Sequence, residues 1–325
     1  MFLTLGRAVV TAHGDERTDE REAMRVALTG ATGFIGHYIA THLADQGHEL
    51  RCWHRPSSKR EGFDHIGDLE WIAGDLGNPE SANSLVDGCD AVVHAALYRP
   101  DMGFCGAEGD PIEFVQKNVV GTLELIEAAR RTGVGRFIFI STCAVHERIL
   151  DDRPLDEAHP LWPTSHYGAY KAAVEKFVHS YGLGHGYPIC ALRPTGVYGV
   201  ARPIQHSKWH DLVLAVVRGD TVQCSRGGKE VHAADVAKAV GILLTADGIA
   251  GEAFNCYGRY ISELDVATLA KELSGSASEI IGEPMQPKHQ IVTDKISALG
   301  MQFGGDELLR QTIADLVEVA GSTTG

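Results

Sequence analysis

A tyrosine and a lysine stand four residues apart, at Tyr167 and Lys171, in a segment whose sequence predicts a helix. Residues four apart share one face of an α-helix, so these two side chains are expected to be neighbours. A lysine ammonium beside a phenol favours the phenolate and lowers the pKa of the tyrosine. Such a tyrosine can exchange a proton with an alcohol or a ketone, which makes the pair a candidate general acid/base.

Two hydroxyl side chains, Ser141 and Thr142, come shortly before this pair, at the end of an apolar segment that predicts a buried strand over residues 136–141. In an open parallel sheet the active-site crevice lies outside the carboxyl ends of the strands. Thr142 can therefore hydrogen-bond the reacting oxygen while Tyr167 moves the proton. The predicted catalytic residues are Thr142, Tyr167 and Lys171.

A glycine-rich turn joins the first predicted strand, residues 26–29, to the helix that follows it. Its glycines, Gly30, Gly33 and Gly36, have the spacing that permits a tight turn, close approach of a pyrophosphate and close helix–strand packing. The amino terminus of the helix adds a site for an anion. This pattern predicts dinucleotide binding. The contacts expected from the turn are Gly30, Thr32, Gly33, Phe34 and Ile35.

The end of the second predicted strand, residues 49–54, carries no acidic residue that could accept the ribose hydroxyls of NAD. His54 and Arg55 stand there instead, with Lys59 and Arg60 close behind. Cationic groups at this position can bind the 2′-phosphate of NADP. The alternative is a basic loop that only contacts solvent. We expect NAD(P) as the cofactor and favour NADP slightly over NAD.

Strand-like and helix-like segments alternate from residue 25 onwards, which predicts an α/β fold with a doubly wound parallel sheet, the Rossmann fold. After residue 193 this alternation gives way to segments punctuated by glycine and proline, which predicts a smaller C-terminal α/β substrate lobe. The strands are expected at 26–29, 49–54, 69–73, 91–95, 136–141 and 188–193. Helices are expected at 111–131, 209–217, 234–244 and 262–273.

This pattern divides the chain into three parts. Residues 24–193 are expected to form the dinucleotide-binding domain, and residues 194–325 mainly the substrate lobe, with some return to the Rossmann core. Residues 1–23 end in a run of mixed charge and lack the features of a secretory signal, which predicts a disordered extension. Met24 directly precedes the first strand, so we hypothesise that the folded unit begins there.

Composition excludes several classes of protein. The formal net charge of −14 disfavours binding to nucleic acid or to anionic membranes. The apolar runs are too short to cross a membrane. Seven cysteines without a CxxC motif indicate reduced thiols in a cytoplasmic protein, not a disulfide framework or a zinc site. His206 and His210 lack the glutamate of the zinc-protease motif, so no metal is expected.

Over about residues 25–319 these motifs resemble the extended short-chain dehydrogenase/reductases, the NAD-dependent epimerase/dehydratase group. The matching segments are 29–36, 74–76, 93–96, 118–122, 141–142, 167–171, 193–199 and 231–237. The resemblance implies that Asp75 and Leu76 flank the adenine, that Ala95 and Ala96 line the cofactor, and that Pro194 lies near the nicotinamide. It also implies that Lys171 binds the nicotinamide ribose. Family members often dimerise through the helices that here carry Asn118 and Tyr167.

Two departures from the family pattern narrow the expected chemistry. Dehydratases carry an Asp-Glu pair after the catalytic threonine, where this chain has Cys143 and Ala144, so loss of water is disfavoured. Nucleotide-sugar enzymes often carry a diphosphate-binding arginine just before the segment that matches residues 231–235. This chain has residues 227–230, Gly-Gly-Lys-Glu, at that place, although Arg218 and Arg226 are close in the sequence. A UDP-sugar substrate is therefore possible, because these arginines could serve, but the sequence does not support it.

The predicted substrate contacts are Arg99, Cys143, His166 and Thr195. Arg99 belongs to a loop over residues 98–110 that follows the fourth strand and is expected either to overhang the crevice or to be a plain surface loop. The small-molecule substrate is expected to be a secondary alcohol or ketone, on a sugar or sugar derivative. The favoured function is hydride transfer with net redox change. One alternative is a sugar or nucleotide-sugar epimerase that works by an internal oxidation-reduction cycle. Another is a non-catalytic, cofactor-sensing binding protein, against which the intact catalytic set argues.

Overall fold

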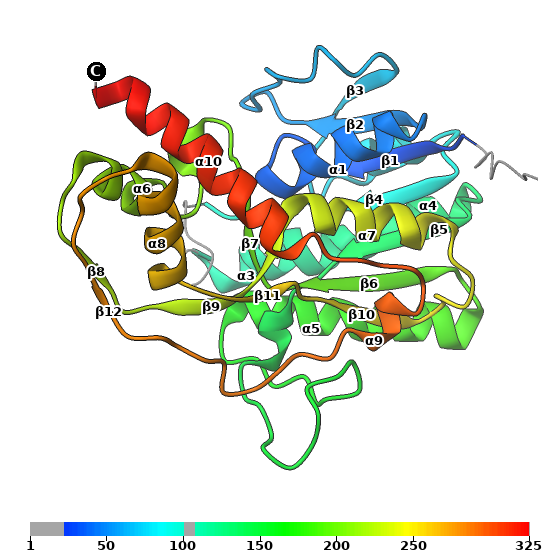
Figure 1. The fold of residues 1–325 in the computed structure, drawn as a ribbon. Helices are drawn as coiled ribbons and strands as arrows, with labels where there is room; N and C mark the ends of the chain where they lie inside the picture. The colour runs from blue at the N-terminus through cyan, green and yellow to red at the C-terminus, as the bar shows by residue number, and fades with distance from the viewer. Residues whose placement is uncertain (1–22, 101–107, 325) are drawn as a thin grey trace, which may run out of the picture.

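The computed structural model describes residues 23–100 and 108–324. Its main feature is a seven-stranded sheet in the order β10-β6-β5-β4-β1-β2-β3, in which every pair of neighbours is parallel (Figure 1). The strands are β1 (Arg25–Thr29), β2 (Glu49–His54), β3 (Leu69–Ala73), β4 (Ala91–His94), β5 (Arg136–Ile140), β6 (Ile189–Pro194) and β10 (Glu252–Cys256). The predicted doubly wound fold is confirmed, and six of these strands lie within one residue of their predicted positions. The predicted extension at residues 1–23 lies outside the described residues, apart from Ala23.

Helices cover both faces of this sheet, which explains why its strands are apolar on both sides. The neighbouring residues Ala27 and Leu28 of β1 point to opposite faces, and both are fully buried. One face packs against α1 (Phe34–Asp45) and α7 (Ala233–Thr245). The other packs against α2 (Pro79–Val86), α4 (Gly121–Arg131) and α5 (His166–His179).

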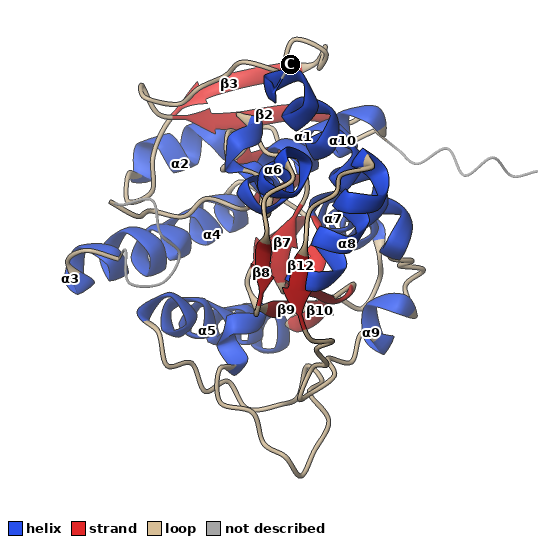
Figure 2. Cartoon of the chain, turned by 60° about the vertical axis from the view of Figure 1, so that its left-hand side comes forward, coloured by secondary structure: helices blue, strands red, loops and turns tan. Residues whose placement is uncertain are grey.

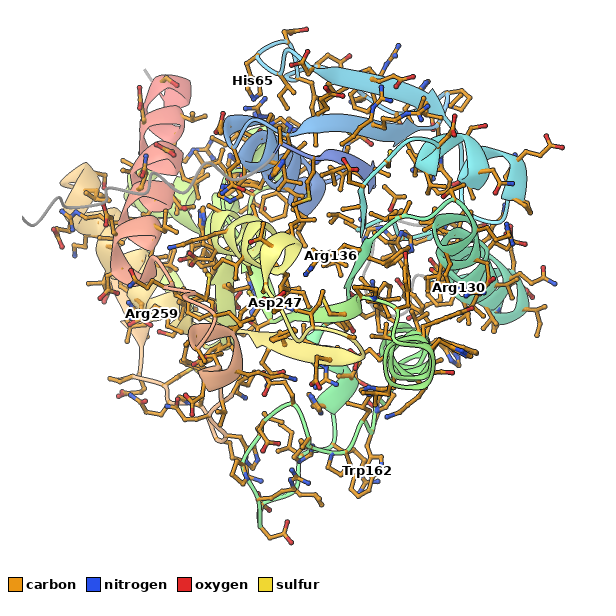
Figure 3. The ribbon with its side chains drawn as sticks, turned by 90° about the vertical axis from the view of Figure 1, so that its right-hand side faces the viewer. His65, Arg130, Arg136, Trp162, Asp247 and Arg259 are labelled. Carbon is orange, nitrogen blue, oxygen red and sulfur yellow. The ribbon has the colours of Figure 1, made fainter. Side chains whose placement is uncertain are left out.

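Arg136, the first residue of β5, fastens α7 to the sheet. Figure 3 shows its side chain beside that helix. Its Nη1 donates to the carbonyl oxygens of Leu243 and Ala246, at 2.9 and 2.6 Å. These carbonyls lie at the carboxyl end of α7, where the helix leaves acceptors without intrahelical partners and favours a cation.

The long helix predicted over residues 111–131 is present, but a π-helical turn interrupts it. It consists of α3 (Pro111–Val115), the π turn (Gln116–Val120) and α4. The amide of Asn118, inside that turn, donates to the carbonyls of Phe114 and Tyr98 and accepts from the Tyr98 N–H. The π turn thus fixes the chain that leaves β4, at the edge of the sheet where a cofactor is expected.

The smaller lobe is formed mainly by the chain that follows β6, and it contains two short sheets (Figure 2). One consists of β7 (Gly196–Tyr198), β9 (Gly227–His232) and β11 (Arg259–Ser262), and the other of β8 (Val222–Cys224) and β12 (Ile280–Gly282). Its helices are α6 (His210–Arg218), α8 (Glu263–Ser274) and α10 (Gly305–Thr324), which share one buried cluster. A short helix, α9 (Asp294–Ser297), lies against β10.

Two segments of the C-terminal half return to the large sheet. Helix α7, predicted at 234–244, packs against α1, and β10 pairs with β6 as the edge strand. The division of the chain at residue 193 stays a prediction. Within residues 23–100 and 108–324, every helix is too short or too polar to act as a transmembrane segment.

Candidate active site

Lys171 is buried at the point where α5 meets the end of β5. Its side chain lies one helical turn after Tyr167, and the residue is only 3% exposed. Its Nζ donates to the carbonyl oxygen of Ile140 at 2.5 Å and lies 5.9 Å from the centre of the Tyr167 ring. Burial lowers the pKa of Lys171 to about 7, although the nearby Glu175 carboxylate opposes the shift. The predicted pairing of Tyr167 with Lys171 is present in the structure.

Thr142 follows β5 and faces the start of α5. Its Oγ1 accepts a hydrogen bond from the Ala144 N–H at 3.1 Å, which fixes the side chain. The first turn of α5 lies directly against this segment, because a Cβ atom on Gly168 would approach the Ala144 carbonyl oxygen to 2.7 Å. Ser165 caps that turn by accepting from the Gly168 N–H. The three predicted catalytic residues thus lie on two segments that are in contact.

A buried charge network, which the sequence did not reveal, supports this arrangement. Glu175 lies one turn after Lys171 on α5, and its carboxylate accepts from Nε and Nη2 of Arg193, at the end of β6. Ser141, next to Thr142, donates to the same carboxylate. The network therefore ties α5, β5 and β6 together at their shared edge.

His146 completes the network on its outer side. Arg193 Nη1 donates to His146 Nε2 at 3.1 Å, and His146 Nδ1 lies 3.2 Å from the Pro160 carbonyl oxygen. Burial, with the Arg193 charge beside it, lowers the pKa of His146 to about 4. The ring is therefore neutral at pH 7, with its proton on Nδ1. Its two nitrogens bind protein groups, so His146 supports the loop that precedes α5.

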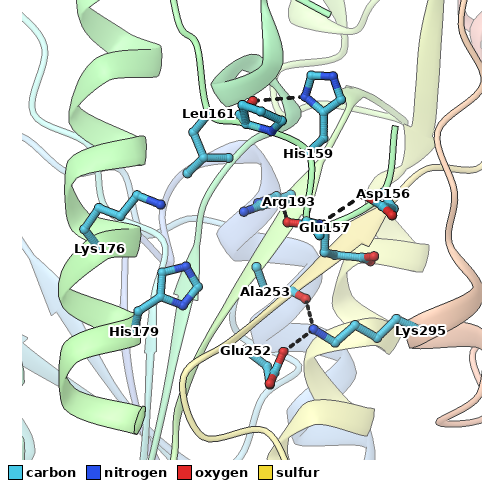
Figure 4. Close-up of a pocket in the computed structure, with 12 residues that line it drawn as sticks. Asp156, Glu157, His159, Leu161, Lys176, His179, Arg193, Glu252, Ala253 and Lys295 are labelled. Carbon is cyan, nitrogen blue, oxygen red and sulfur yellow. Dashed lines mark hydrogen bonds and ion pairs between the residues drawn. The ribbon is translucent and has the colours of Figure 1, made fainter. Parts of the chain in front are cut away.

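Arg193 lines a surface pocket at the β6–β10 edge of the sheet (Figure 4). Charged side chains surround it, and in the figure Lys295 of α9 reaches Glu252 and the Ala253 carbonyl. The described residues that line this pocket include none of the three predicted catalytic residues. It is therefore separate from the catalytic crevice.

The glycine-rich turn has the form that a pyrophosphate requires. Gly30 has a φ angle of +77°, and a Cβ atom there would come within 2.8 Å of the Ala95 carbonyl and the Ala96 nitrogen. A Cβ atom on Gly36 would approach the Gly30 carbonyl oxygen to 2.0 Å, so α1 packs as closely as the motif predicts. Gly33 is the N-cap of α1 and supplies no capping side chain. The first N–H groups of α1 are left for an anionic ligand.

A buried histidine fixes the next part of the cofactor edge. His94, the last residue of β4, lies between Thr29 and Thr122, at 2.6 and 2.8 Å from their hydroxyl oxygens. Burial lowers the pKa of His94 to about 3, so the ring is neutral and structural. Thr29 in turn accepts from the Ala96 N–H at 3.1 Å. The predicted cofactor residues Ala95 and Ala96 are thus held beside Gly30.

The remaining predicted cofactor residues stand at the ends of other strands along the same edge. His54 ends β2, and Arg55 after it is exposed. Asp75 accepts from the Leu76 N–H at 2.9 Å just beyond β3. Pro194 is the buried last residue of β6. Because the strands are parallel, all of these positions lie along one edge of the sheet, together with the open amino terminus of α1, as a dinucleotide site requires.

The predicted substrate residues lie on four different segments and differ in burial. The Cys143 thiol donates to the Arg193 carbonyl at 3.1 Å, and burial raises its pKa to about 12, so it is neither a nucleophile nor an acid at pH 7. Thr195 follows β6, and His166 is the exposed first residue of α5. Arg99 is half-buried, while most of the loop after it, residues 101–107, lies outside the described residues. Their substrate roles stay predictions.

Strand β9 carries two charged residues that the sequence analysis did not assign to the site. Glu230, 3% exposed, pairs with Lys208 at 2.5 Å. Lys229, on the opposite face of the strand, has its pKa lowered by burial. Strand β9 pairs with β7, which begins two residues after the end of β6, and this pairing sets Glu230 opposite Gly196.

The two arginines considered for a diphosphate are both exposed, and Arg218 is the last residue of α6. Arg226 pairs with Glu263 at 2.9 Å, and its side chain is 84% exposed. The space beside Gly228 is occupied by Glu230, since a Cβ atom there would lie 2.4 Å from Glu230 Oε1. Among the described residues, no three His, Cys, Asp or Glu side chains gather where they could hold a metal ion.

Comparison with known proteins identifies the family. The model of the NAD dependent epimerase/dehydratase family matches residues 26–256. The dTDP-D-glucose 4,6-dehydratase of Mus musculus is 32% identical over 267 residues, which cover 77% of this chain and 72% of that protein. The ketoreductase of Stigmatella aurantiaca that acts on 4-hydroxy-2-methyl-3-oxo-4-farnesyl-3,4-dihydroquinoline-1-oxide is 29% identical over 81% of this chain and 77% of its own length.

A solved structure agrees with these matches. The UDP-glucose 4-epimerase of Thermus thermophilus, in complex with NAD, superposes with a TM-score of 0.73 and is 26% identical. The match covers 91% of this chain and 99% of that one. The chain therefore belongs to the NAD-dependent epimerase/dehydratase family of the extended short-chain dehydrogenases/reductases, and it is an NAD(P)-binding enzyme.

Proposed function

We propose that this enzyme interconverts a secondary alcohol and a ketone, with Tyr167 as the general acid/base. The observation that carries the proposal is the burial of Lys171 one helical turn after Tyr167, with its Nζ bonded to the Ile140 carbonyl and 5.9 Å from the centre of the Tyr167 ring. An ammonium in this position stabilises a phenolate on its neighbour and is stabilised by it in turn. The alternative function, a cofactor-sensing binding protein, does not explain why an ammonium is buried at a cost in free energy.

Thr142 and Tyr167 have different roles at the reacting oxygen: Thr142 binds it and Tyr167 exchanges its proton. Thr142 already accepts from the Ala144 N–H, so its hydroxyl hydrogen can point to a substrate oxygen and hold it. Tyr167 Oη then takes the alcohol proton during oxidation or returns it during reduction. NAD(P), when bound along the edge formed by Gly30, Ala95 and Pro194, supplies the hydride acceptor or donor.

The residues after Thr142 favour this reaction over dehydration. Loss of water needs an acid and a base beside the substrate. Cys143 holds its proton tightly, with a pKa raised to about 12 by burial, and Ala144 has no titratable group. Similarity to the mouse dehydratase therefore extends to the fold and the redox half of the chemistry.

Two finer proposals concern the cofactor and the substrate. We favour NADP slightly over NAD, because Arg55 is exposed at the end of β2 and makes no ion pair within the described residues. A sugar or sugar derivative is the favoured substrate, since the mouse and Thermus relatives are named for glucose derivatives.

Net oxidation and epimerisation use the same residues, so the fate of the cofactor separates them. The test is to denature freshly purified protein and to quantify the released dinucleotide by chromatography. An empty protein that turns over alcohols with added NADP supports the proposal. Near-stoichiometric bound NAD, without net turnover, supports the epimerase instead. Failure to bind either dinucleotide contradicts both.

We also propose that the enzyme is a cytoplasmic homodimer. Apolar side chains are exposed on the helix of residues 111–131, at Ile112, Val115 and Val120, and on α5 at Phe177. These helices form one outer side of the molecule (Figure 2). A second copy that packs on this side would bury the apolar residues. The cytoplasmic location rests on the cysteines of the described residues, all of which are free thiols.

A further inference from the structure

One buried carboxylate oxygen in the smaller lobe has no hydrogen-bond partner. Glu230 Oε1 accepts a hydrogen bond from the Lys208 ammonium. Glu230 Oε2 is buried, and no group among the described residues donates to it. An unsatisfied buried acceptor is costly and calls for a ligand that can donate. Burial raises the pKa of the Glu230 carboxyl, and Lys208 opposes that shift.

This oxygen lies next to the end of β6, beside the catalytic edge. Strand β7 begins at Gly196, two residues after Pro194, and pairs with β9 so that Gly196 faces Glu230. A Cβ atom on Gly196 would lie 2.6 Å from Glu230 Oε2. The absence of a side chain at Gly196 leaves the carboxylate close to the backbone that leads away from the reaction centre.

A second unsatisfied group lies at the adjacent position. The hydroxyl oxygen of Thr195, between Pro194 and Gly196, is also buried without a partner among the described residues. The two unsatisfied oxygens therefore lie where the chain leaves the carboxyl end of β6 and pairs with β9, and the carboxyl ends of parallel strands are where such sheets bind ligands.

We propose that Glu230 selects an uncharged, hydroxyl-bearing substrate and excludes nucleoside diphosphates from this site. The inference rests on the proposed function, because it assigns the substrate class of the same crevice. A substrate hydroxyl can donate to Glu230 Oε2, and Thr195 can accept from or donate to a second hydroxyl. A diphosphate would bring like charges together in a site of low exposure, and Lys208 is already neutralised by Glu230.

The first experiment measures the charge preference of the site with UDP and uridine as probes. Each is titrated by calorimetry into the protein loaded with its dinucleotide. The wild type is expected to bind UDP no more than about threefold tighter than uridine, or to bind neither. Glu230→Gln removes the negative charge and frees Lys208, so UDP affinity is expected to rise on the order of tenfold while uridine affinity stays unchanged.

Glu272→Gln is the matched control, since Glu272 is 61% exposed and pairs with Arg310 on the outer surface of the lobe. It is expected to change neither affinity. Wild-type binding of UDP at least tenfold tighter than uridine overturns the proposal, as does an unchanged UDP affinity in a folded Glu230→Gln variant. If that variant does not fold, the wild-type comparison decides alone.

The second experiment tests the hydroxyl preference by turnover. Uncharged secondary alcohols, UDP-glucose and dTDP-glucose are compared at equal concentration. Activity is expected only with uncharged compounds, and Glu230→Gln is expected to raise their KM on the order of tenfold with little change in kcat. Turnover of either nucleotide sugar overturns the inference. A protein inactive on every compound contradicts the proposed function, while the UDP and uridine titrations still decide this inference.

Discussion

Arg193 and Glu175 form a buried ion pair that links β6 to α5, the helix that carries Tyr167 and Lys171. The distance from Arg193 Nη2 to Glu175 Oε2 is 2.6 Å, and each side chain is 1% exposed. Glu175 also accepts from Ser141, the residue before Thr142, and shares α5 with Lys171. The pair therefore sets how the segment that carries Thr142 lies against the helix that carries Lys171.

Removing the negative charge of this pair is expected to destabilise the protein strongly. Glu175→Gln leaves the Arg193 guanidinium buried without a counterion, which costs about 3–5 kcal/mol of unfolding free energy. Urea unfolding monitored by circular dichroism measures the change. Glu272→Gln, in the exposed pair with Arg310, is expected to cost less than about 1 kcal/mol. Equal losses of unfolding free energy in the two variants would show that the buried pair stabilises the protein no more than the exposed pair does.

Lys171 is expected to make stability rise with pH. Its pKa is lowered to about 7 in the folded protein by burial, against about 10.4 in an unfolded chain. Between these values the unfolded state binds more protons, so the unfolding free energy of the protein without cofactor increases with pH, by up to about 1 kcal/mol per unit. Lys171→Met lacks this contribution and is expected to be more stable than the wild type near pH 7, with the difference shrinking toward pH 10.

The control for that comparison is Lys176→Met, on the exposed side of the same helix. Its stability is expected to follow the pH profile of the wild type. Thermal or urea unfolding at several pH values between about 6 and 10 provides the data. If the stability of Lys171→Met follows the same pH profile as the wild type, Lys171 is protonated in the folded protein over this whole pH range. Burial then does not lower its pKa.

Arg55 is expected to decide between the two dinucleotides. Arg55→Glu replaces a cation with an anion at the end of β2, so the affinity for NADP relative to NAD is expected to fall at least tenfold. Fluorescence titration with NADPH and NADH measures this ratio. Arg130→Glu, on the exposed surface of α4, serves as the control for a general charge effect. A ratio that changes less than about twofold in Arg55→Glu would contradict the assignment.

Val115 is expected to contribute to the dimer interface. The residue is 45% exposed on α3, and Val115→Glu would place a charge in a buried apolar interface. The wild type is expected to have the mass of a dimer by light scattering, and the variant that of a monomer. Ile281→Glu introduces the same charge at a 42% exposed apolar residue of β12, and it should leave the dimer intact. A monomeric wild type contradicts the proposal.

The strands of the large sheet could be predicted because burial on both faces leaves a local signature. The run Phe137 to Ile140 is apolar throughout, and the glycine spacing after β1 has a fixed stereochemical purpose. The Tyr167 and Lys171 pairing was equally visible, since a helix brings residues four apart together. These features depend on short stretches of chain, which is why one sequence is enough to find them.

The smaller lobe and the charge networks could not be predicted in the same way. Strands β7, β8 and β12 have only three residues each, too few for a periodic pattern. The pairing of Glu230 with Lys208 joins residues 22 positions apart, and a sequence does not state which charges meet. Glu175 gave one signal that was overlooked: it lies four residues after Lys171, on the same helical face.

The central claim is that Tyr167 moves the proton, and one substitution tests it most directly. Tyr167→Phe removes only the phenol oxygen, so the ring and its packing remain. With an alcohol that the wild type oxidises, formation of NADPH or NADH is followed by absorbance, and cofactor affinity is measured in parallel by fluorescence. The kcat of Tyr167→Phe is expected to fall by at least about a hundredfold, with cofactor affinity unchanged within about threefold. Turnover within about tenfold of the wild type would contradict it, because another group would then be the acid/base.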